Sequence, residues 1–130
     1  MIPTAKTAFA LLAIAASGLV MAESAGQQKY PDIVDVEVMP SGENRFDFDV
    51  TVSSPYDSAE RYADAFRVMS RDEAVFGVRE LLHDHANEQP FTRRLSGIEI
   101  PPEVNEVIVQ GRDQTHGYGG ETVQVGLPGR

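Results

Sequence analysis

The sequence contains no cysteine, and this absence removes several classes of function at once. Disulfide bonds, thiol redox chemistry and metal sites built from thiolates are all excluded. A lipid attached through a cysteine side chain is excluded for the same reason. The fold must therefore be held together by packing alone.

Basic residues are also scarce: 11 Lys and Arg stand against 20 Asp and Glu, which gives a formal net charge of −9. Nucleic acids and anionic membranes are bound through positively charged surfaces, so the composition argues against both as partners. The simplest role of the excess acid is solubility.

Long apolar runs are missing as well. A membrane-spanning helix needs about 20 consecutive apolar residues, and the sequence has no apolar run of that length. The apolar stretch at residues 8–16 follows Lys6 and precedes Val20-Met21-Ala22, a small-x-small pattern. This arrangement predicts an export signal at residues 1–22, cleaved after Ala22, and a periplasmic or secreted protein. We expect residues 23–31 to be a flexible arm and residues 32–130 to form one domain.

Apolar and polar residues alternate with a period of two, which predicts an all-β domain. The clearest strand is residues 46–52, where Phe46, Phe48, Val50 and Val52 alternate with polar residues. Six further strands are predicted at residues 34–38, 62–68, 75–82, 91–95, 107–109 and 123–127. Residues 56–71 could instead form a helix, because Ala59, Tyr62, Ala63 and Phe66 have helical spacing.

Seven short strands joined by turns predict a seven-stranded antiparallel sandwich of two sheets. The pattern resembles immunoglobulin and fibronectin type III domains, in which the third strand carries a buried aromatic residue where this chain has Phe66. The corner at residues 98–105 is similar to the connection between their fifth and sixth strands. The sequence also resembles small secreted bacterial proteins with Tyr-Ala-Asp, His-Asp-His and Gly-Tyr-Gly-Gly segments, here at residues 62–64, 83–85 and 117–120.

In such a sandwich every second loop lies at the same end, which brings together the loops at residues 53–61, 83–89 and 112–120. These loops contain His83, His85 and His116, all the histidines of the chain. Residues at i and i+2 of an extended chain project to one side about 7 Å apart, so two imidazoles could converge on one ion. We therefore predict a Zn²⁺ or Cu²⁺ site formed by these histidines and Glu88. The alternative oxygen ligands are Asp57 and Asp113.

Two other interpretations of the histidines are open. Loop histidines commonly bind backbone or carboxylate groups, with no metal involved. Gly77 followed by His83-x-His85 and Glu88 also resembles the first metal motif of the cupin jelly rolls, a family in which two histidines, a glutamate and a later histidine hold the metal. That resemblance implies a small jelly roll and a metal-dependent enzyme, but the spacing before Glu88 is shorter than in the family and no second motif follows.

The remaining polar residues suggest no catalytic machinery. The serines lie in turns and none occupies a nucleophile elbow, and the arginines are most simply cross-strand ion-pair partners of Asp47, Asp49 and Glu106 (Arg79, Arg93, Arg94 and Arg112). Tyr118 could face a ligand from its glycine-rich loop. The sequence thus predicts an exported β-sandwich that acts as a binding or accessory module for a divalent metal or a protein partner, and not as an enzyme.

Overall fold

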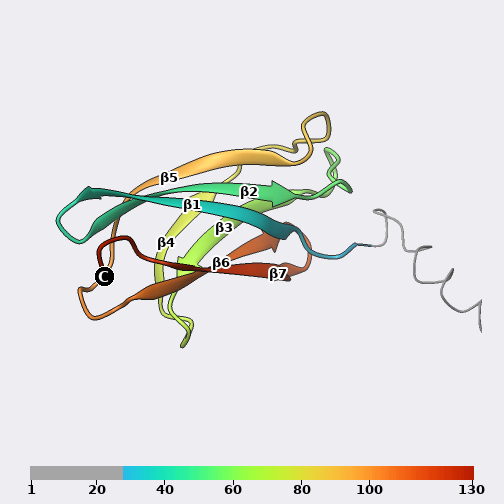
Figure 1. The fold of residues 1–130 in the computed structure, drawn as a ribbon. Helices are drawn as coiled ribbons and strands as arrows, with labels where there is room; N and C mark the ends of the chain where they lie inside the picture. Colours follow the sequence, from blue (N-terminus) through green and yellow to red (C-terminus); the bar gives the residue numbers. More distant parts are fainter. Residues whose placement is uncertain (1–27) are drawn as a thin grey trace, which may run out of the picture.

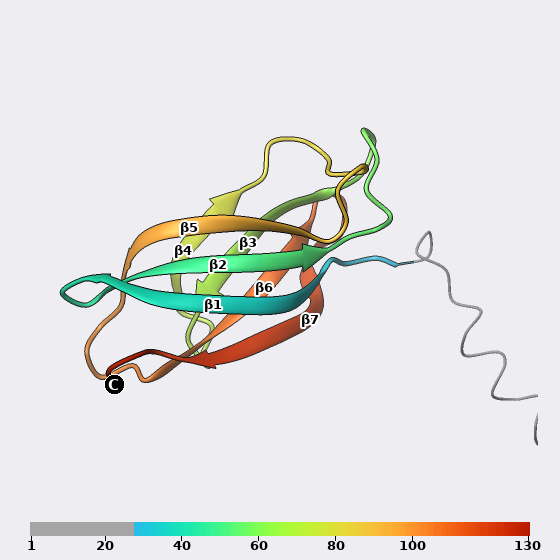
Figure 2. The same ribbon diagram turned by 45° about the horizontal axis from the view of Figure 1, so that its top comes forward.

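The computed structural model describes residues 28–130, which form two antiparallel β-sheets packed face to face (Figures 1 and 2). One sheet has three strands in the order β1-β2-β5, and the other has four in the order β4-β3-β6-β7. The strands are β1 (Asp32–Gly42), β2 (Arg45–Ser53), β3 (Ala63–Met69), β4 (Val75–Glu80), β5 (Phe91–Glu99), β6 (Glu106–Asp113) and β7 (Gly117–Gly126). The predicted export signal at residues 1–22 lies outside the described residues. No helix within residues 28–130 is long and apolar enough to cross a bilayer.

The alternating pattern of β2 places it at the centre of the three-stranded sheet. Phe46, Phe48, Val50 and Val52 are all buried, while the residues between them are half-buried. Phe48 pairs with Val38 of β1 on one side and with Leu95 of β5 on the other. The backbone of such a strand hydrogen-bonds to both neighbouring strands, while its apolar side chains, all on one face, fill one layer of the core.

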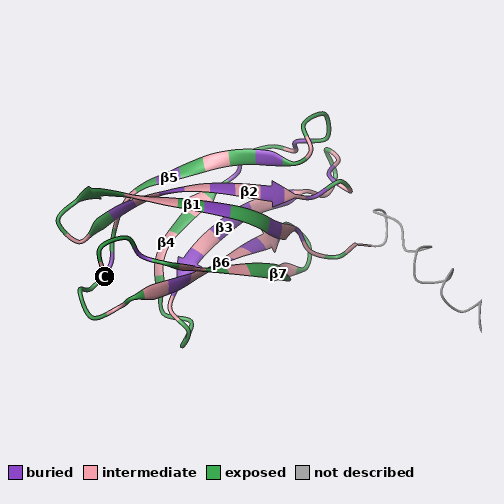
Figure 3. Cartoon of the chain, viewed as in Figure 1, coloured by how far each residue is buried: buried purple, intermediate pink, exposed green. Residues whose placement is uncertain are grey.

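The opposite layer comes from β3 and β6, the two central strands of the four-stranded sheet. Phe66 and Val68 of β3 and Val107 and Val109 of β6 are fully buried. Figure 3 shows buried residues along the strands of both sheets, and these side chains form one hydrophobic cluster. The aromatic residue expected inside the third strand is therefore in the core.

The helical alternative for residues 56–71 is wrong. β3 is hydrogen-bonded to β4 on one edge and to β6 on the other, so its backbone groups are satisfied within the sheet. The pairing with β6 shifts register between Ala63 and Ala65, which is a β-bulge. The Asp64 side chain is directed to Arg112 of β6 and not into the core.

The turn between β6 and β7 is much shorter than the predicted loop at residues 112–120. Tyr118 pairs with Arg112 and Gly119 pairs with Gly111, so the glycine-rich segment belongs to β7. Glycine contributes no side chain to an alternating pattern, and the pattern therefore left this part of the strand undetected.

Residues 28–31, the described part of the predicted arm, pack against the domain. Pro31 is buried, and a Cβ atom added at Gly119 would come within 2.5 Å of the Tyr30 ring. Arg61 Nη2 donates hydrogen bonds of 2.7 Å to the carbonyl oxygens of Gln28 and Lys29. The segment is thus fixed both through its backbone and through two of its rings.

Candidate functional site

Three loops meet at one end of the sandwich, as the alternation of strand direction requires (Figure 2). They comprise residues 54–62, 81–90 and 114–116. The Gln114 amide donates to the Tyr62 carbonyl at 2.9 Å, and the Ser54 amide donates to Gln89 Oε1 at 2.7 Å. The predicted convergence of these loops is therefore present, and hydrogen bonds maintain it.

Asp113, at the end of β6, is the first of two buried carboxylates that hold this end together. It is fully buried and accepts hydrogen bonds from Tyr56 Oη at 2.6 Å, from Arg61 Nε at 3.2 Å and from the amides of Thr115 and His116. Burial alone would raise the pKa of Asp113, but the hydrogen bonds from Tyr56, the two amides and Arg61 outweigh it and hold the pKa below its ordinary value. Burial and the neighbouring Asp113 raise the pKa of Tyr56, so its hydroxyl remains a donor.

Asp57, with 6% of its surface exposed, is the second buried carboxylate. Its Oδ1 accepts from the Ala63 amide at 3.0 Å, and its Oδ2 accepts from the His85 amide at 2.9 Å. This side chain therefore ties the loop before β3 to the loop after β4. Asp57 and Asp113, the alternative oxygen ligands predicted for a metal, are instead bound to protein donors.

His83 and His85 lie side by side, with ring centroids 5.0 Å apart. The His85 ring stacks on Phe91 at 3.9 Å with an interplanar angle of 10°, only 7% of the residue is exposed, and its Nδ1 is buried without a partner among the described residues. Burial lowers the pKa of His85, and the positive charges of Arg93 and His83 add to the effect. His83 is exposed, and its Nδ1 lies 2.9 Å from the Asp84 carbonyl oxygen.

The other two predicted ligands are engaged elsewhere. The exposed His116 ring packs edge-on to Tyr30, with centroids 6.2 Å apart. Glu88 forms an ion pair of 3.0 Å with Arg93, and the hydrogen bond from Arg93 lowers the pKa of Glu88. Within residues 28–130, no three His, Cys, Asp or Glu residues are grouped so that they could hold a metal ion. The structure thus joins His83 to His85 but does not complete the predicted set of four.

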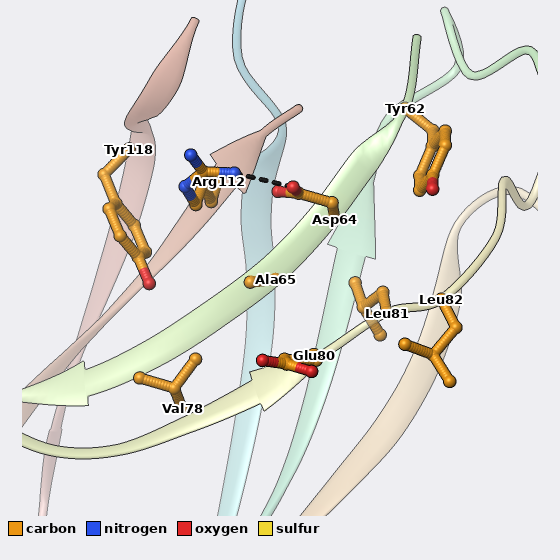
Figure 4. Close-up of a pocket in the computed structure, with 9 residues that line it drawn as sticks. All are labelled: Tyr62, Asp64, Ala65, Val78, Glu80, Leu81, Leu82, Arg112 and Tyr118. Carbon is orange, nitrogen blue, oxygen red and sulfur yellow. Dashed lines mark hydrogen bonds and ion pairs between the residues drawn. The ribbon is translucent and has the colours of Figure 1, made fainter. Parts of the chain in front are cut away.

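A pocket on the outer side of the four-stranded sheet was not predicted from the sequence (Figure 4). Its volume is about 400 Å³, and all four strands of the sheet, together with the segments next to them, contribute to its walls. It is lined by Tyr62, Asp64, Ala65, Val78, Glu80, Leu81, Leu82, Arg112 and Tyr118. Two of the segments singled out in the sequence, Tyr-Ala-Asp and Gly-Tyr-Gly-Gly, supply side chains to it. The sequence alone gave no reason to place them together.

The side chains around this pocket are ordered by contacts with one another. Arg112 Nη1 donates to Asp64 Oδ2 at 2.6 Å, an interaction that raises the pKa of Arg112. The guanidinium of Arg67 lies 3.9 Å from the centroid of the Tyr118 ring and is held there by hydrogen bonds to Gln110 Oε1 of 2.7 and 3.0 Å. Tyr118 is therefore packed against the sheet and does not swing freely.

The arginines pair with acids only partly as predicted. Arg94 binds Asp49 through two hydrogen bonds of 2.7 and 2.9 Å, as expected for opposed residues on β5 and β2. Arg93, Arg112 and Glu106 have partners other than those predicted, namely Glu88, Asp64 and Arg71. None of these three pairings was expected from the strand pattern.

No known family profile matches the chain. A protein of Halomicrobium mukohataei described as "Putative lipoprotein" is 40% identical over 94 residues. The match covers 72% of this chain but 46% of the relative, so the chain spans less than half of that protein's length. Among solved structures, a variant of the superoxide reductase (neelaredoxin) of Archaeoglobus fulgidus in the reduced form is similar, with a TM-score of 0.43, 12% identity and coverage of 74% of this chain and 86% of that one. This likeness is too slight to carry an argument about function.

Proposed function

We propose that the chain is an exported binding or accessory module that docks a protein partner on the outer face of its four-stranded sheet. The apolar stretch at residues 8–16 and the description of the relative as a lipoprotein both support export. The strand orders β1-β2-β5 and β4-β3-β6-β7 support a fibronectin type III-like fold. A jelly roll, with eight strands in two Greek keys, fits this order less well.

The observation that carries the proposal is the ordered pocket lined by Tyr62, Leu82, Arg112 and Tyr118. Tyrosine and arginine are among the residue types that contribute most binding energy at protein interfaces. Contacts with Asp64 and Arg67 hold Arg112 and Tyr118 in place before any partner arrives. A surface that is already ordered loses less conformational entropy on binding.

Leu82 supplies the test, since 79% of this leucine is exposed beside the pocket. We would immobilise the protein, the Leu82→Ser variant and the Tyr118→Ala variant, and measure the amount of each captured partner by quantitative mass spectrometry. Val34→Ser is the matched control, because Val34 is 51% exposed on β1 of the other sheet. The proposal is supported if the wild type and Val34→Ser retain a partner that Leu82→Ser binds about tenfold more weakly. Equal capture by all four proteins contradicts it.

A second function, transition-metal binding, is supported by the pairing of His83 and His85. Two imidazoles bound tetrahedrally to one ion at about 2.0–2.1 Å place their ring centres roughly 5 Å apart, and the observed separation is 5.0 Å. The contact of His83 Nδ1 with the Asp84 carbonyl favours a proton on Nδ1 and leaves Nε2 free to bind a metal. The lowered pKa of His85 keeps its ring neutral, which is the form that binds metals.

Calorimetric titration with Cu²⁺ and Zn²⁺ tests this second function. We expect saturable binding that is tighter for Cu²⁺, following the usual order of divalent affinities. His83→Ala should abolish it, while His116→Ala should leave it unchanged because His116 is packed on Tyr30. An absence of saturable binding, or equal losses in the two variants, would show that the imidazole pair is structural.

A further inference from the structure

The pocket beside Leu82 has an excess of negative charge. Its three charged side chains are Asp64, Glu80 and Arg112, and the ion pair between Arg112 and Asp64 balances one charge of each sign. Glu80 is exposed and has no ion pair among the described residues. One carboxylate on the pocket wall is therefore left without an ion-pair partner, while the Arg67 guanidinium, bound to Gln110, lies beside the pocket on the Tyr118 ring.

Asp64 has unused hydrogen-bonding capacity as well. Its Oδ2 accepts from Arg112, whereas Oδ1 is buried and has no donor within the described part of the chain. An unsatisfied carboxylate oxygen away from water is unfavourable, and a donor that reaches it recovers that free energy. Asp64 lines the pocket, and 23% of its side chain is exposed.

The apolar part of the pocket suits the stem of a long side chain. Leu82 is 79% exposed and Val78 is 44% exposed, and both line the pocket. Lysine and arginine place an aliphatic stem on apolar surface and a charged head on a polar group. An incoming carboxylate or phosphate would instead face Glu80 and Asp64, which disfavour it.

We propose that this pocket receives a lysine or arginine side chain from a basic segment of the protein partner, with Glu80 and Asp64 as its acceptors. This assignment deepens the proposed function and rests on it. The net charge of −9 would speed the encounter with a basic segment and make it dependent on salt. Charge complementarity thus selects the class of partner.

The test is a nuclear magnetic resonance titration with blocked hexapeptides of alternating glycine and arginine, glycine and lysine, or glycine and glutamate. We expect the two basic peptides to shift the backbone amides of Asp64, Glu80, Leu82 and Tyr118, and the glutamate peptide to shift none of them. Raising the salt concentration should weaken the binding. Ethylguanidinium serves as a fourth probe: if it binds as tightly as the arginine peptide, the pocket takes a free cation and the proposed occupant is wrong.

Glu80→Gln is the decisive variant, with Glu37→Gln as its control. Both substitutions remove one negative charge, but Glu37 lies exposed on β1 in the other sheet. Loss of a charge-assisted hydrogen bond should weaken peptide binding about tenfold for Glu80→Gln, against less than about twofold for the distant charge. Equal effects of the two variants, or shifts centred on another part of the protein, overturn the assignment. If Leu82→Ser loses the captured partner and Glu80→Gln keeps it, the docking face is right and the basic side chain is wrong.

Discussion

Replacing Asp113 by alanine should destabilise the whole domain, because this carboxylate is the common acceptor of the loops at one end. It is 0% exposed, and four donor groups converge on it, from Tyr56, Arg61, Thr115 and His116. Removing one partner of a buried ion pair costs about 3–5 kcal/mol, since the other charge is left unpaired. A domain of this size has a free energy of unfolding of about 5–15 kcal/mol, so the loss is a large fraction of it.

The assay is thermal unfolding followed by circular dichroism, with Asp49→Ala as the control. Asp49 also binds an arginine, but Arg94 is half exposed, and such a surface pair contributes less than about 1 kcal/mol. We expect the Asp113→Ala variant to melt more than about 12 °C below the wild type. If Asp113→Ala is no less stable than Asp49→Ala, then the buried carboxylate does not organise this end of the molecule.

The same side chain makes a prediction about pH. Since the folded protein lowers the pKa of Asp113, its contribution to stability is present above the pKa of an unfolded aspartate, about 3.9. The contribution is lost as the pH falls through the lower pKa of the folded state. The difference in unfolding free energy between the wild type and Asp113→Asn should therefore narrow below about pH 4. A difference that stays constant down to pH 2 would contradict this account.

Three further predictions concern the core, the N-terminal segment and the buried histidine. Phe66→Ala should lower the free energy of unfolding by about 3–5 kcal/mol, measured by urea unfolding, because Phe66 is fully buried. Gly120→Ala should lower the free energy of unfolding by at least about 2 kcal/mol, because Gly120 has φ +83° and an added Cβ would clash with the Pro31 carbonyl. Gly126→Ala is the control, since a Cβ there meets no atom within 4 Å and the change should be close to neutral. His85 should titrate below pH 6.5 when followed by nuclear magnetic resonance, because burial lowers its pKa. Its contribution to stability is present above pH 6.5 and should be lost as the pH falls through the lowered pKa. A midpoint at or above 6.5 would refute this.

The strands that could be predicted are those in which side-chain chemistry alternates. Residues 46–52 were predicted as a strand, and β2 is Arg45–Ser53. Residues 123–127 were also predicted, but β7 begins at Gly117, because glycines and the exposed residues after them produce no alternation. The β-bulge at Ala63–Ala65 was equally invisible, since it depends on the register with β6 and not on local composition. Packing of distant strands decides such features.

The pocket lay beyond sequence reasoning for a similar reason. Asp64 and Arg112 are brought together by the pairing of β3 with β6, and Glu80 joins them because β4 is the edge strand beside β3. Alternation shows which side of a strand is polar, but it does not show which strand is its neighbour. The Tyr-Ala-Asp and Gly-Tyr-Gly-Gly segments are far apart in the sequence, and the sheet order brings them to one surface.

The histidine end shows why convergence of loops does not by itself make a metal site. Strand direction correctly brought the loops together, but side-chain positions depend on competition for partners. Asp113 already accepts hydrogen bonds from four donor groups. If Asp113 bound a metal instead, each donor left without an acceptor would cost about 1–3 kcal/mol. His85 gains burial of its ring against Phe91, and Glu88 pairs with Arg93. A carboxylate at the base of a loop accepts hydrogen bonds from the loop's unpaired backbone amides and is then not available to a ligand. Around Glu80 the backbone amides are already paired in a sheet. Acids in such positions are therefore better candidates for ligand binding.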